Sequence, residues 1–220
     1  YVQGSFGTHC TFPGPPTIDI FSTANAAFVS GFDANGYCLW AEQVGLGYHC
    51  TSSADVDVNG NSYISCDVVG SFYRAKNHNR LDADVNLAKF NSQGICQWYK
   101  TRYTFNYSTV SSIAGDNEGN CYLSGCLWGT YNFGPDLLQG TMADWNQFVA
   151  KASPTGDWIW GLQTYFGNTY TNIRDIVTVE SGNCIVVGSY SGVNLDFGNI
   201  VFPAPENASV FVAKAGTSTI

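Results

Sequence analysis

The sequence predicts an all-β, β-propeller-like fold made of four imperfect repeats of roughly sixty residues, each with four strands, the first and last incomplete. Two observations predict it. Aromatic residues make up 15% of the chain, charged residues only 12%, and glycine occurs 24 times, a composition typical of short strands and tight turns. The same landmarks also recur in a fixed order. We therefore expect one repeat domain over residues 1–220 and no helix longer than two turns.

The first landmark is an apolar strand that ends in small residues, named strand b here. Its copies start at Tyr1, Tyr63, Tyr122 and Ile185, which lie 62, 59 and 63 residues apart. We expect strands near Tyr63–Val68, Cys121–Trp128 and Cys184–Tyr190. Three copies continue with an aromatic residue close to a glycine, at Phe12-Pro-Gly14, Phe133-Gly134 and Phe197-Gly198.

The second landmark, strand c, reads Phe28-Val-Ser30, Asn86-Leu-Ala-Lys89, Phe148-Val-Ala-Lys151 and Phe211-Val-Ala-Lys214. The third, strand d, follows a turn glycine by four residues and carries a tryptophan: Gly36/Trp40, Gly94/Trp98 and Gly156/Trp160. We expect the three tryptophans to occupy equivalent, largely buried sites between sheets. Strand a precedes each Gly-Asn turn, and such turns supply the positive φ angles of tight hairpins.

These landmarks resemble a known family. The order Gly-Asn-x-Tyr-x-x-Gly, Phe-Gly, Phe-Val-Ala-Lys and Gly-x-x-x-Trp resembles the SBBP-type β-propeller repeat of bacteria, over essentially the whole chain. The copy Cys121–Trp160 matches best, whereas Tyr63–Trp98 departs, with Cys66 in place of glycine and no clear Phe-Gly. The resemblance implies a secreted or surface-attached propeller, in a family recognised by its scaffold and without common catalytic residues.

The landmarks predict four b and four c strands but only three a and three d strands, so one contiguous d–a segment is expected to be absent. Strand edges without a partner are templates for β-strand addition. The segments Tyr1–Phe6 and Val210–Lys214 are apolar and nearly uncharged. We therefore expect the chain to associate with copies of itself, head to tail, in a ring or a filament.

Charge narrows the range of partners. The formal net charge is −8 with nine Lys and Arg residues, which argues against nucleic acid because phosphate binding needs clustered cations. The local basic cluster is interpreted as a solvated loop; it consists of Arg74, Lys76, His78 and Arg80. No apolar run approaches the roughly twenty residues of a membrane span.

The eight cysteines include no Cys-x-x-Cys pair, which favours disulfides over zinc and an extracellular location. Positions in the repeat favour the pairs Cys10–Cys50 and Cys96–Cys121, because cysteines must lie within about 7 Å to be bridged. Cys38 and Cys184 have no obvious partner, so one of them is expected to bridge subunits.

No motif predicts an enzyme, a cofactor or a metal site. Asp55–Asn61 resembles the start of a calcium loop, but Cys66 stands where the bidentate glutamate belongs, and a plain hairpin is favoured. The dipeptides His9-Cys10 and His49-Cys50 are better explained by a disulfide with flanking histidines than by a metal site.

The functional prediction is an extracellular structural protein that associates with itself, as a filament or sheath subunit. The alternative is a monomeric surface module that binds glycan or protein. Exposed aromatic side chains would serve a sugar-binding platform. The aromatic residues that fit the repeat least are the candidates for such a surface: Trp128, Tyr131, Trp145 and Trp158.

Overall fold

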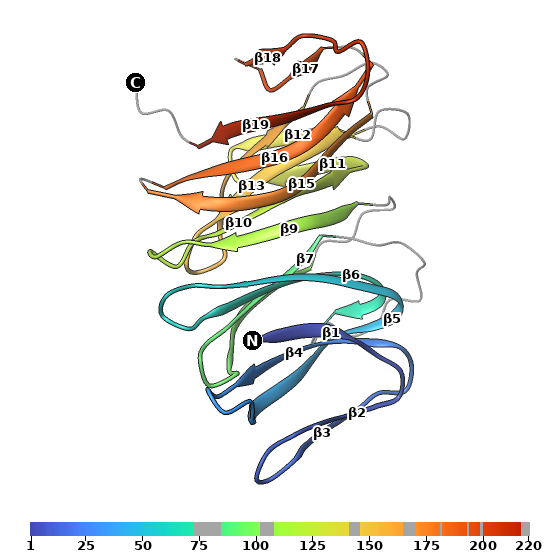
Figure 1. Ribbon diagram of the computed structural model, residues 1–220, viewed down its shortest axis with the longest axis vertical. Coiled ribbons are helices and arrows are strands. Elements are labelled where there is room, and N and C mark those ends of the chain that lie inside the picture. Colours follow the sequence, from blue (N-terminus) through green and yellow to red (C-terminus); the bar gives the residue numbers. More distant parts are fainter. Residues whose placement is uncertain are drawn as a thin grey trace. The chain divides into compact units, whose positions relative to one another are not determined.

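The computed structural model describes residues 1–72, 85–101, 108–140, 146–164, 170–180, 182–192, 194–198 and 200–216 (Figure 1). Side chains are described throughout these ranges except at 47–52, 67–72, 101 and 170. The described residues form strands and no helix, which confirms the all-β prediction, so no helix that could cross a membrane is found among them. The chain divides into two compact units, Tyr1–Tyr103 and Thr104–Ile220.

The first unit contains a six-stranded antiparallel sheet and a small hairpin. The sheet order is β1 (Val2–Phe6), β4 (Ala26–Phe32), β5 (Cys38–Val56), β6 (Ser62–Phe72), β7 (Asn86–Phe90) and β8 (Cys96–Thr101). Strand β5 pairs with β4 through its first half and with β6 through its second half. It therefore supplies strand d of the first repeat and strand a of the second without a break. The hairpin joins β2 (His9–Phe12) to β3 (Ile18–Phe21).

The second unit contains two larger sheets and two hairpins. One sheet has the order β14 (Trp158–Gln163), β13 (Asn146–Ala152), β10 (Cys121–Leu127) and β9 (Thr109–Gly115). The other has the order β15 (Tyr170–Val179), β16 (Asn183–Ser191) and β19 (Ser209–Ala215). The hairpins are β11 (Gly129–Phe133) with β12 (Asp136–Gly140), and β17 (Leu195–Asp196) with β18 (Val201–Phe202).

The predicted strands are confirmed, and each sheet follows the predicted a–b–c–d meander. The expected segments coincide with β6, β10, β16 and β19. Between strands b and c, the repeats also carry the separate hairpins β2–β3, β11–β12 and β17–β18, which the sequence did not predict. Closure of these sheets into a propeller stays a prediction.

The turn between strands c and d is held by one side chain. The Asp33 carboxylate accepts the backbone N–H groups of Asn35 and Tyr37, both at 2.9 Å. Gly36 completes this turn with φ 83°, a conformation that side chains disfavour, so glycine recurs at this landmark. The a–b turn after Asp57 has the same construction, which confirms the hairpin interpretation of Asp55–Asn61.

The strand b glycines lie opposite the phenylalanine that begins the strand c landmark. The cross-strand pairs are Gly4–Phe28, Gly125–Phe148 and Gly188–Phe211. A Cβ atom at Gly188 would lie 2.7 Å from ring carbons of Phe211, so the missing side chain makes room for the ring. The second repeat changes both members of the pair, because Asn86 replaces the phenylalanine and donates a 3.1 Å hydrogen bond to the carbonyl of Cys66.

Each sheet has two distinct faces. We call the face that carries Phe28, Phe148 or Phe211 the Phe face, and the opposite face, which carries Trp40 or Trp160, the Trp face. In the first unit, Val29 and Trp40 pack against Ala88 and Phe90 of the second repeat. In the second unit, Val149 and Trp160 pack with the fourth-repeat residues Val186, Phe211 and Ala213. Within each unit, therefore, the Trp face of one repeat packs on the Phe face of the next.

The prediction that all three tryptophans are largely buried holds for Trp160, which is 6% exposed. Trp40 and Trp98 are half-buried. Trp40 still contacts the second repeat, because its Nε1 donates to the Ser92 carbonyl at 3.1 Å and its ring centroid lies 6.2 Å from that of Phe90.

Candidate functional site

The small hairpins cover the Phe faces, and the Phe-Gly landmark positions them. Phe133, at the end of β11, stacks on Phe148 with ring centroids 5.4 Å apart. In the fourth repeat, Phe197 takes the same place against Phe211 at 5.5 Å. Phe12 contacts Phe28 in the first repeat at 5.1 Å. The landmark therefore marks an aromatic pair that fastens each hairpin to its sheet.

In the third repeat, the hairpin also contacts strand d. Phe133 meets Trp158 edge-on at 4.8 Å, and a Cβ atom at Gly161 would lie 2.7 Å from Cβ of Phe133. Asp136 Oδ2 accepts the backbone N–H of Gly161 at 3.0 Å. The first repeat shows a similar contact, because the Cys38 N–H donates to the Pro13 carbonyl at 2.7 Å. A small residue on strand d thus allows the hairpin to approach closely.

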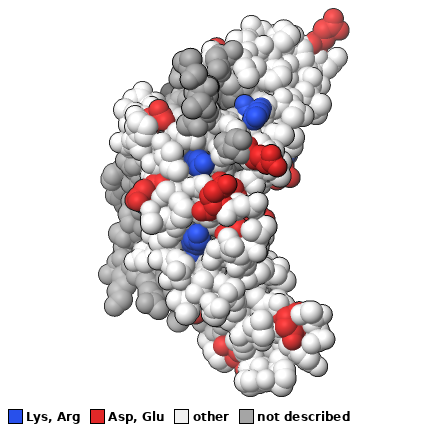
Figure 2. Space-filling view, turned by 90° about the vertical axis from the view of Figure 1, so that its left-hand side faces the viewer, with Lys and Arg blue, Asp and Glu red and all other residues white. Residues whose placement is uncertain are grey.

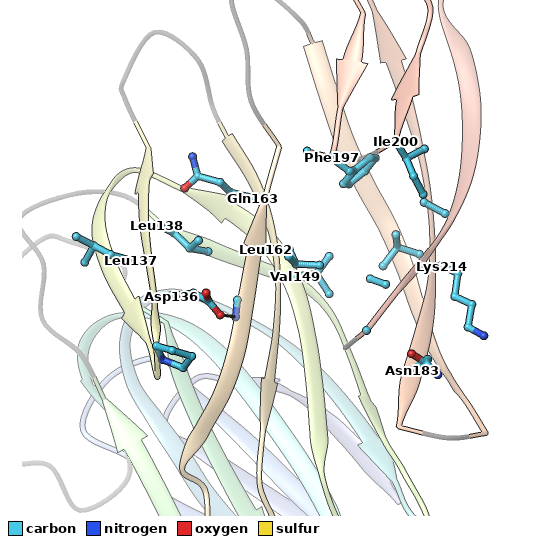
Figure 3. Close-up of a pocket in the computed structure, with 17 residues that line it drawn as sticks. Asp136, Leu137, Leu138, Val149, Leu162, Gln163, Asn183, Phe197, Ile200 and Lys214 are labelled. Atoms are coloured by element: carbon cyan, nitrogen blue, oxygen red, sulfur yellow. Dashed lines mark hydrogen bonds between the residues drawn. The ribbon is translucent and has the colours of Figure 1, made fainter. Parts of the chain in front are cut away.

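In the fourth repeat a pocket of about 770 Å³ lies beside Phe197 and β19 (Figure 3). Its walls come from β13 and β14 (Val149, Leu162), from the β11–β12 hairpin, and from the Phe face of the last sheet (Val186, Ala213). Figure 3 shows Leu162 and Val149 facing Phe197 across the opening, with Lys214 pointing away from it. The volume falls in the range of about 300–1,000 Å³ seen for ligand sites.

The polar groups in the pocket wall are bonded to the wall itself. The Asp136 carboxylate accepts from Gly161, and Gln163 Oε1 accepts the Gln139 N–H at 2.6 Å. The wall therefore presents apolar side chains and the edge of a strand, rather than a pair of groups arranged for proton transfer. Such a surface suits the binding of an extended chain segment.

The last sheet exposes its Trp face. Val212 of β19 is 65% exposed, whereas its equivalents Val29 and Val149 are 1% and 2% exposed. Three more exposed valines share this face, as the strand registers show: Val177, Val187 and Val210. We call these four residues the valine face. On the face drawn in Figure 2, Lys and Arg appear as isolated side chains, with Asp and Glu side chains beside and between them.

A second repeated cluster joins an aspartate, a tyrosine and a lysine on the Trp face. Asp116 Oδ2 accepts from the Tyr122 hydroxyl at 3.2 Å and lies 3.9 Å from Lys151 Nζ, which sits 4.8 Å from the centre of the Tyr122 ring. Burial, with the nearby Asp116 charge, raises the pKa of Tyr122 far above its usual value. All three side chains are buried, so the cluster fixes the turn and is not open to a substrate.

The same cluster recurs in the second repeat, with Asp57, Tyr63 and Lys89. In the fourth repeat, Ile185 replaces the tyrosine and Lys214 is exposed. Lys151 also donates to the carbonyl of Gly182 at 3.4 Å, so it links the third repeat to the a–b turn of the fourth.

The ionised carboxylate of Asp57 holds the a–b turn of the second repeat, so we expect this turn to lose stability at acidic pH. Burial by itself raises the pKa of this carboxyl, but hydrogen bonds from Asn61, Tyr63 and Asn59 outweigh burial and hold the pKa below its usual value. The ionised carboxylate therefore stabilises the fold at pH values above its unfolded pKa of about 3.9. This contribution is lost as the pH falls through the lower folded pKa.

We expect Asp57→Asn to lower the free energy of unfolding near neutral pH by about 1–2 kcal/mol. The difference from the wild type should shrink as the pH falls from about 5 to 2. Urea unfolding at a series of pH values measures this. A difference that stays constant over that range would contradict the assigned role of the ionised carboxylate.

The predicted cysteine sites are only partly described. The side chain of Cys50 lies outside the described residues, so its pairing with Cys10 stays a prediction. The second predicted pair stays a prediction too, because Cys96 and Cys121 belong to different units.

The two proposed intersubunit cysteines are both buried, Cys38 at 6% and Cys184 at 0% exposed, which contradicts the expectation that one faces a second subunit. Burial raises the pKa of Cys184 to about 12. Burial also raises the pKa of Cys38, and nearby Cys10 adds to the effect.

The three candidate surface aromatics that the structure describes do not form an exposed platform. Tyr131 is 1% exposed and stacks beside Phe133, so its assignment to the surface was wrong. Its position on β11 alternates with exposed residues, and the inward position is the one that it takes. Trp128 and Trp158 are half-buried, and Trp145 lies outside the described residues.

His9 belongs to an exposed cluster on the β2–β3 hairpin. Its Nε2 lies 2.9 Å from Asp19 Oδ1, and its ring stacks on Phe21 with centroids 4.4 Å apart. Hydrogen bonds from Thr11 and then from His9 hold the pKa of Asp19 below its usual value. The Thr11 hydroxyl donates to Asp19 Oδ1 at 2.6 Å and lies 3.2 Å from His9 Nε2, so the three polar side chains hold one another on the exposed hairpin. Within the described ranges, no group of three His, Cys, Asp or Glu residues is arranged to hold a metal ion.

Sequence reasoning missed the pocket, because its walls come from segments far apart in the chain. The Phe-Gly landmark singles out Phe197 in the sequence, but its contact with Phe211 and its place in the pocket wall depend on the fold.

The comparisons with known proteins include a distant structural likeness. No family model and no curated protein matches this chain. A crystal structure of a protein of unknown function from Bacteroides caccae is similar, with 12% sequence identity and a TM-score of 0.41. The match covers 87% of this chain and 57% of that one, so this chain spans a little over half the length of that structure. A likeness of this degree assigns neither a family nor an activity.

Proposed function

We propose that this chain is an extracellular structural protein that associates with copies of itself through the valine face. The observation that carries the proposal is the contrast between Val149 and Val212, which occupy the same repeat position but are 2% and 65% exposed. Exposed apolar patches of this kind mark sites of protein association. Within both units the equivalent face packs on the Phe face of the following repeat.

A second copy can supply such a face from its first repeat. There, Phe28 and its neighbours pack only with residues of the same repeat and its hairpin in the described part of the unit, including Phe12 and Ile18. Val2 and Phe21 of this repeat are 49% and 68% exposed. Contact between two different surfaces does not close into a dimer, so the assembly would be a ring or a filament.

The alternative, a monomeric module that binds glycan, has less support. Sugar-binding platforms need exposed aromatic rings. Tyr131 lies in the core, and Trp158 is half-buried with its ring against Phe133.

Sedimentation velocity over a range of concentrations tests the proposal. We expect species larger than the 23.8 kDa chain, and we expect Val212→Asp to weaken association at least about tenfold, because a charge would be buried at the contact. Val58→Asp is the matched control, since Val58 is 77% exposed on a turn outside the valine face. A wild-type chain that stays monomeric at all concentrations contradicts the proposal, as does equal weakening by both variants.

A further inference from the structure

The hairpin of the first repeat meets strand d in the same way as the hairpin of the third repeat. A Cβ atom added at Gly14 would lie 3.1 Å from the Cys38 carbonyl oxygen, and one added at Gly134 would lie 2.6 Å from the Trp158 carbonyl oxygen. Cys38 and Trp158 also hold the same place in their strands, since each lies two residues before the strand d tryptophan. The two repeats can therefore be compared residue by residue at this contact.

Two large aromatic residues of the third repeat are replaced by cysteines in the first. Tyr131 stacks beside Phe133 with ring centroids 6.0 Å apart, and Trp158 meets the same phenylalanine edge-on at 4.8 Å. The corresponding residues of the first repeat are Cys10 and Cys38. Both changes fall at one contact, so they place one thiol on the hairpin and one on the strand that it covers.

The position of Cys10 faces the sheet in each of the three small hairpins. Its equivalents lie two residues before the phenylalanine of the Phe-Gly landmark, where Tyr131 and Leu195 are 1% and 0% exposed. Cys10 pairs with Ile20 across its own hairpin, and both residues pack against the core of the first repeat. The Cys10 side chain therefore lies on the inner side of the hairpin.

This core brings the two thiols together. Cys38 is 6% exposed and belongs to the cluster that it forms with Phe12 and Phe28. The half-buried Cys10 packs against the same cluster. Burial raises the pKa of Cys38, and the charge of a Cys10 thiolate raises it further, an effect that needs the two groups to be near each other.

We propose that Cys10 and Cys38 form a disulfide in an oxidising environment, and that this bond fastens the β2–β3 hairpin to strand d of the first repeat. The bond does covalently what two aromatic side chains do by packing in the third repeat. Each thiol loses one proton and one electron, and an external disulfide such as oxidised glutathione accepts them and becomes two thiols. Because Cys10 can join only one partner, this pair is an alternative to the predicted pair Cys10–Cys50. The proposal is independent of the self-association, since the bond lies within one chain and outside the valine face.

Mass mapping of the non-reduced protein identifies the partner of Cys10. The intact chain is treated with oxidised glutathione, its remaining thiols are blocked, and it is cut by a protease that cleaves after acidic residues. Cleavage at Asp33 separates Cys10 from Cys38. Cleavage at Glu42 separates Cys38 from Cys50, so each of the three cysteines falls in its own peptide. We expect one linked pair of peptides that joins Cys10 to Cys38 and comes apart on reduction. Any other state of Cys10, whether a bond to Cys50 or a blocked thiol, would overturn the proposal.

Thermal unfolding distinguishes a disulfide from a role in packing alone. Dithiothreitol should lower the Tm of the wild type by roughly 5–10 °C more than it lowers the Tm of Cys10→Ala or Cys38→Ala, because these variants have no such bond to reduce. Cys126→Ala is the matched control, since Cys126 is also 6% exposed but lies in the other unit, and it should respond to dithiothreitol as the wild type does. An equal response of all four proteins would leave the two thiols with a packing role only and would overturn the disulfide.

Discussion

Replacing Gly188 with valine is expected to lower the free energy of unfolding by about 3 kcal/mol or more, at the upper end of the range for overpacked sites. A side chain there would collide with the Phe211 ring on one side and with the Asn172 carbonyl of β15 on the other. Backbone atoms cannot rotate away as the end of a long side chain can, so β15 or β19 would have to move.

The measurement is chemical unfolding of the purified variant, followed by circular dichroism. Ser189→Ala on the same strand is the control, because Ser189 is half-buried and a smaller side chain creates no collision. We expect this control to change the free energy of unfolding by less than about 1 kcal/mol. If Gly188→Val lowers the free energy of unfolding as little as Ser189→Ala does, the Phe211 ring does not need a glycine at this position.

Replacing Trp160 with alanine is expected to cost about 3–5 kcal/mol, the usual range for a large buried aromatic side chain. Trp160 meets Tyr122 edge-on with ring centroids 6.1 Å apart and belongs to the core between the third and fourth repeats. Its removal would leave a cavity bordered by both sheets, and the sheets are too strongly hydrogen-bonded to close it fully.

The neighbouring Ile159, which is 38% exposed, provides the control on the same strand. Ile159→Ala should cost less than about 1.5 kcal/mol in the same denaturant titration, because less of its surface is buried. A loss below about 1 kcal/mol for Trp160→Ala would place this tryptophan outside the core and would contradict the packing of the Trp face on the Phe face.

The repeat explains which parts of the fold the sequence predicts. Landmarks such as Phe148-Val-Ala-Lys151 lie within single strands, so their spacing predicts strand positions directly. The pairing of Gly188 with Phe211 is not visible in the same way, because it depends on the register of two strands that are separated by a hairpin. The second repeat could have indicated this pairing, since Cys66 and Asn86 change together there.

The errors at the candidate site have a related cause. Tyr131 was assigned to the surface because it does not fit the four-strand repeat, but it belongs to a separate hairpin with its own inward face. Cys184 was one of the two cysteines expected to bridge subunits, because the repeat offers it no obvious partner, yet its side chain lies in the core between the third and fourth repeats. In both residues, a shift of one position along a strand changes the face on which the side chain lies, and spacing alone does not set that position.

The most direct test of the account is a methyl NMR spectrum of the valine-labelled chain, recorded at increasing protein concentration. We expect the methyl signals of Val177, Val187, Val210 and Val212 to shift or broaden together as the chain associates. The signals of Val149 and Val186, which are 2% and 0% exposed, should stay unchanged and serve as internal controls. Concentration dependence confined to valines outside this face, or none for any valine, would contradict the claim that the chain associates through the last sheet.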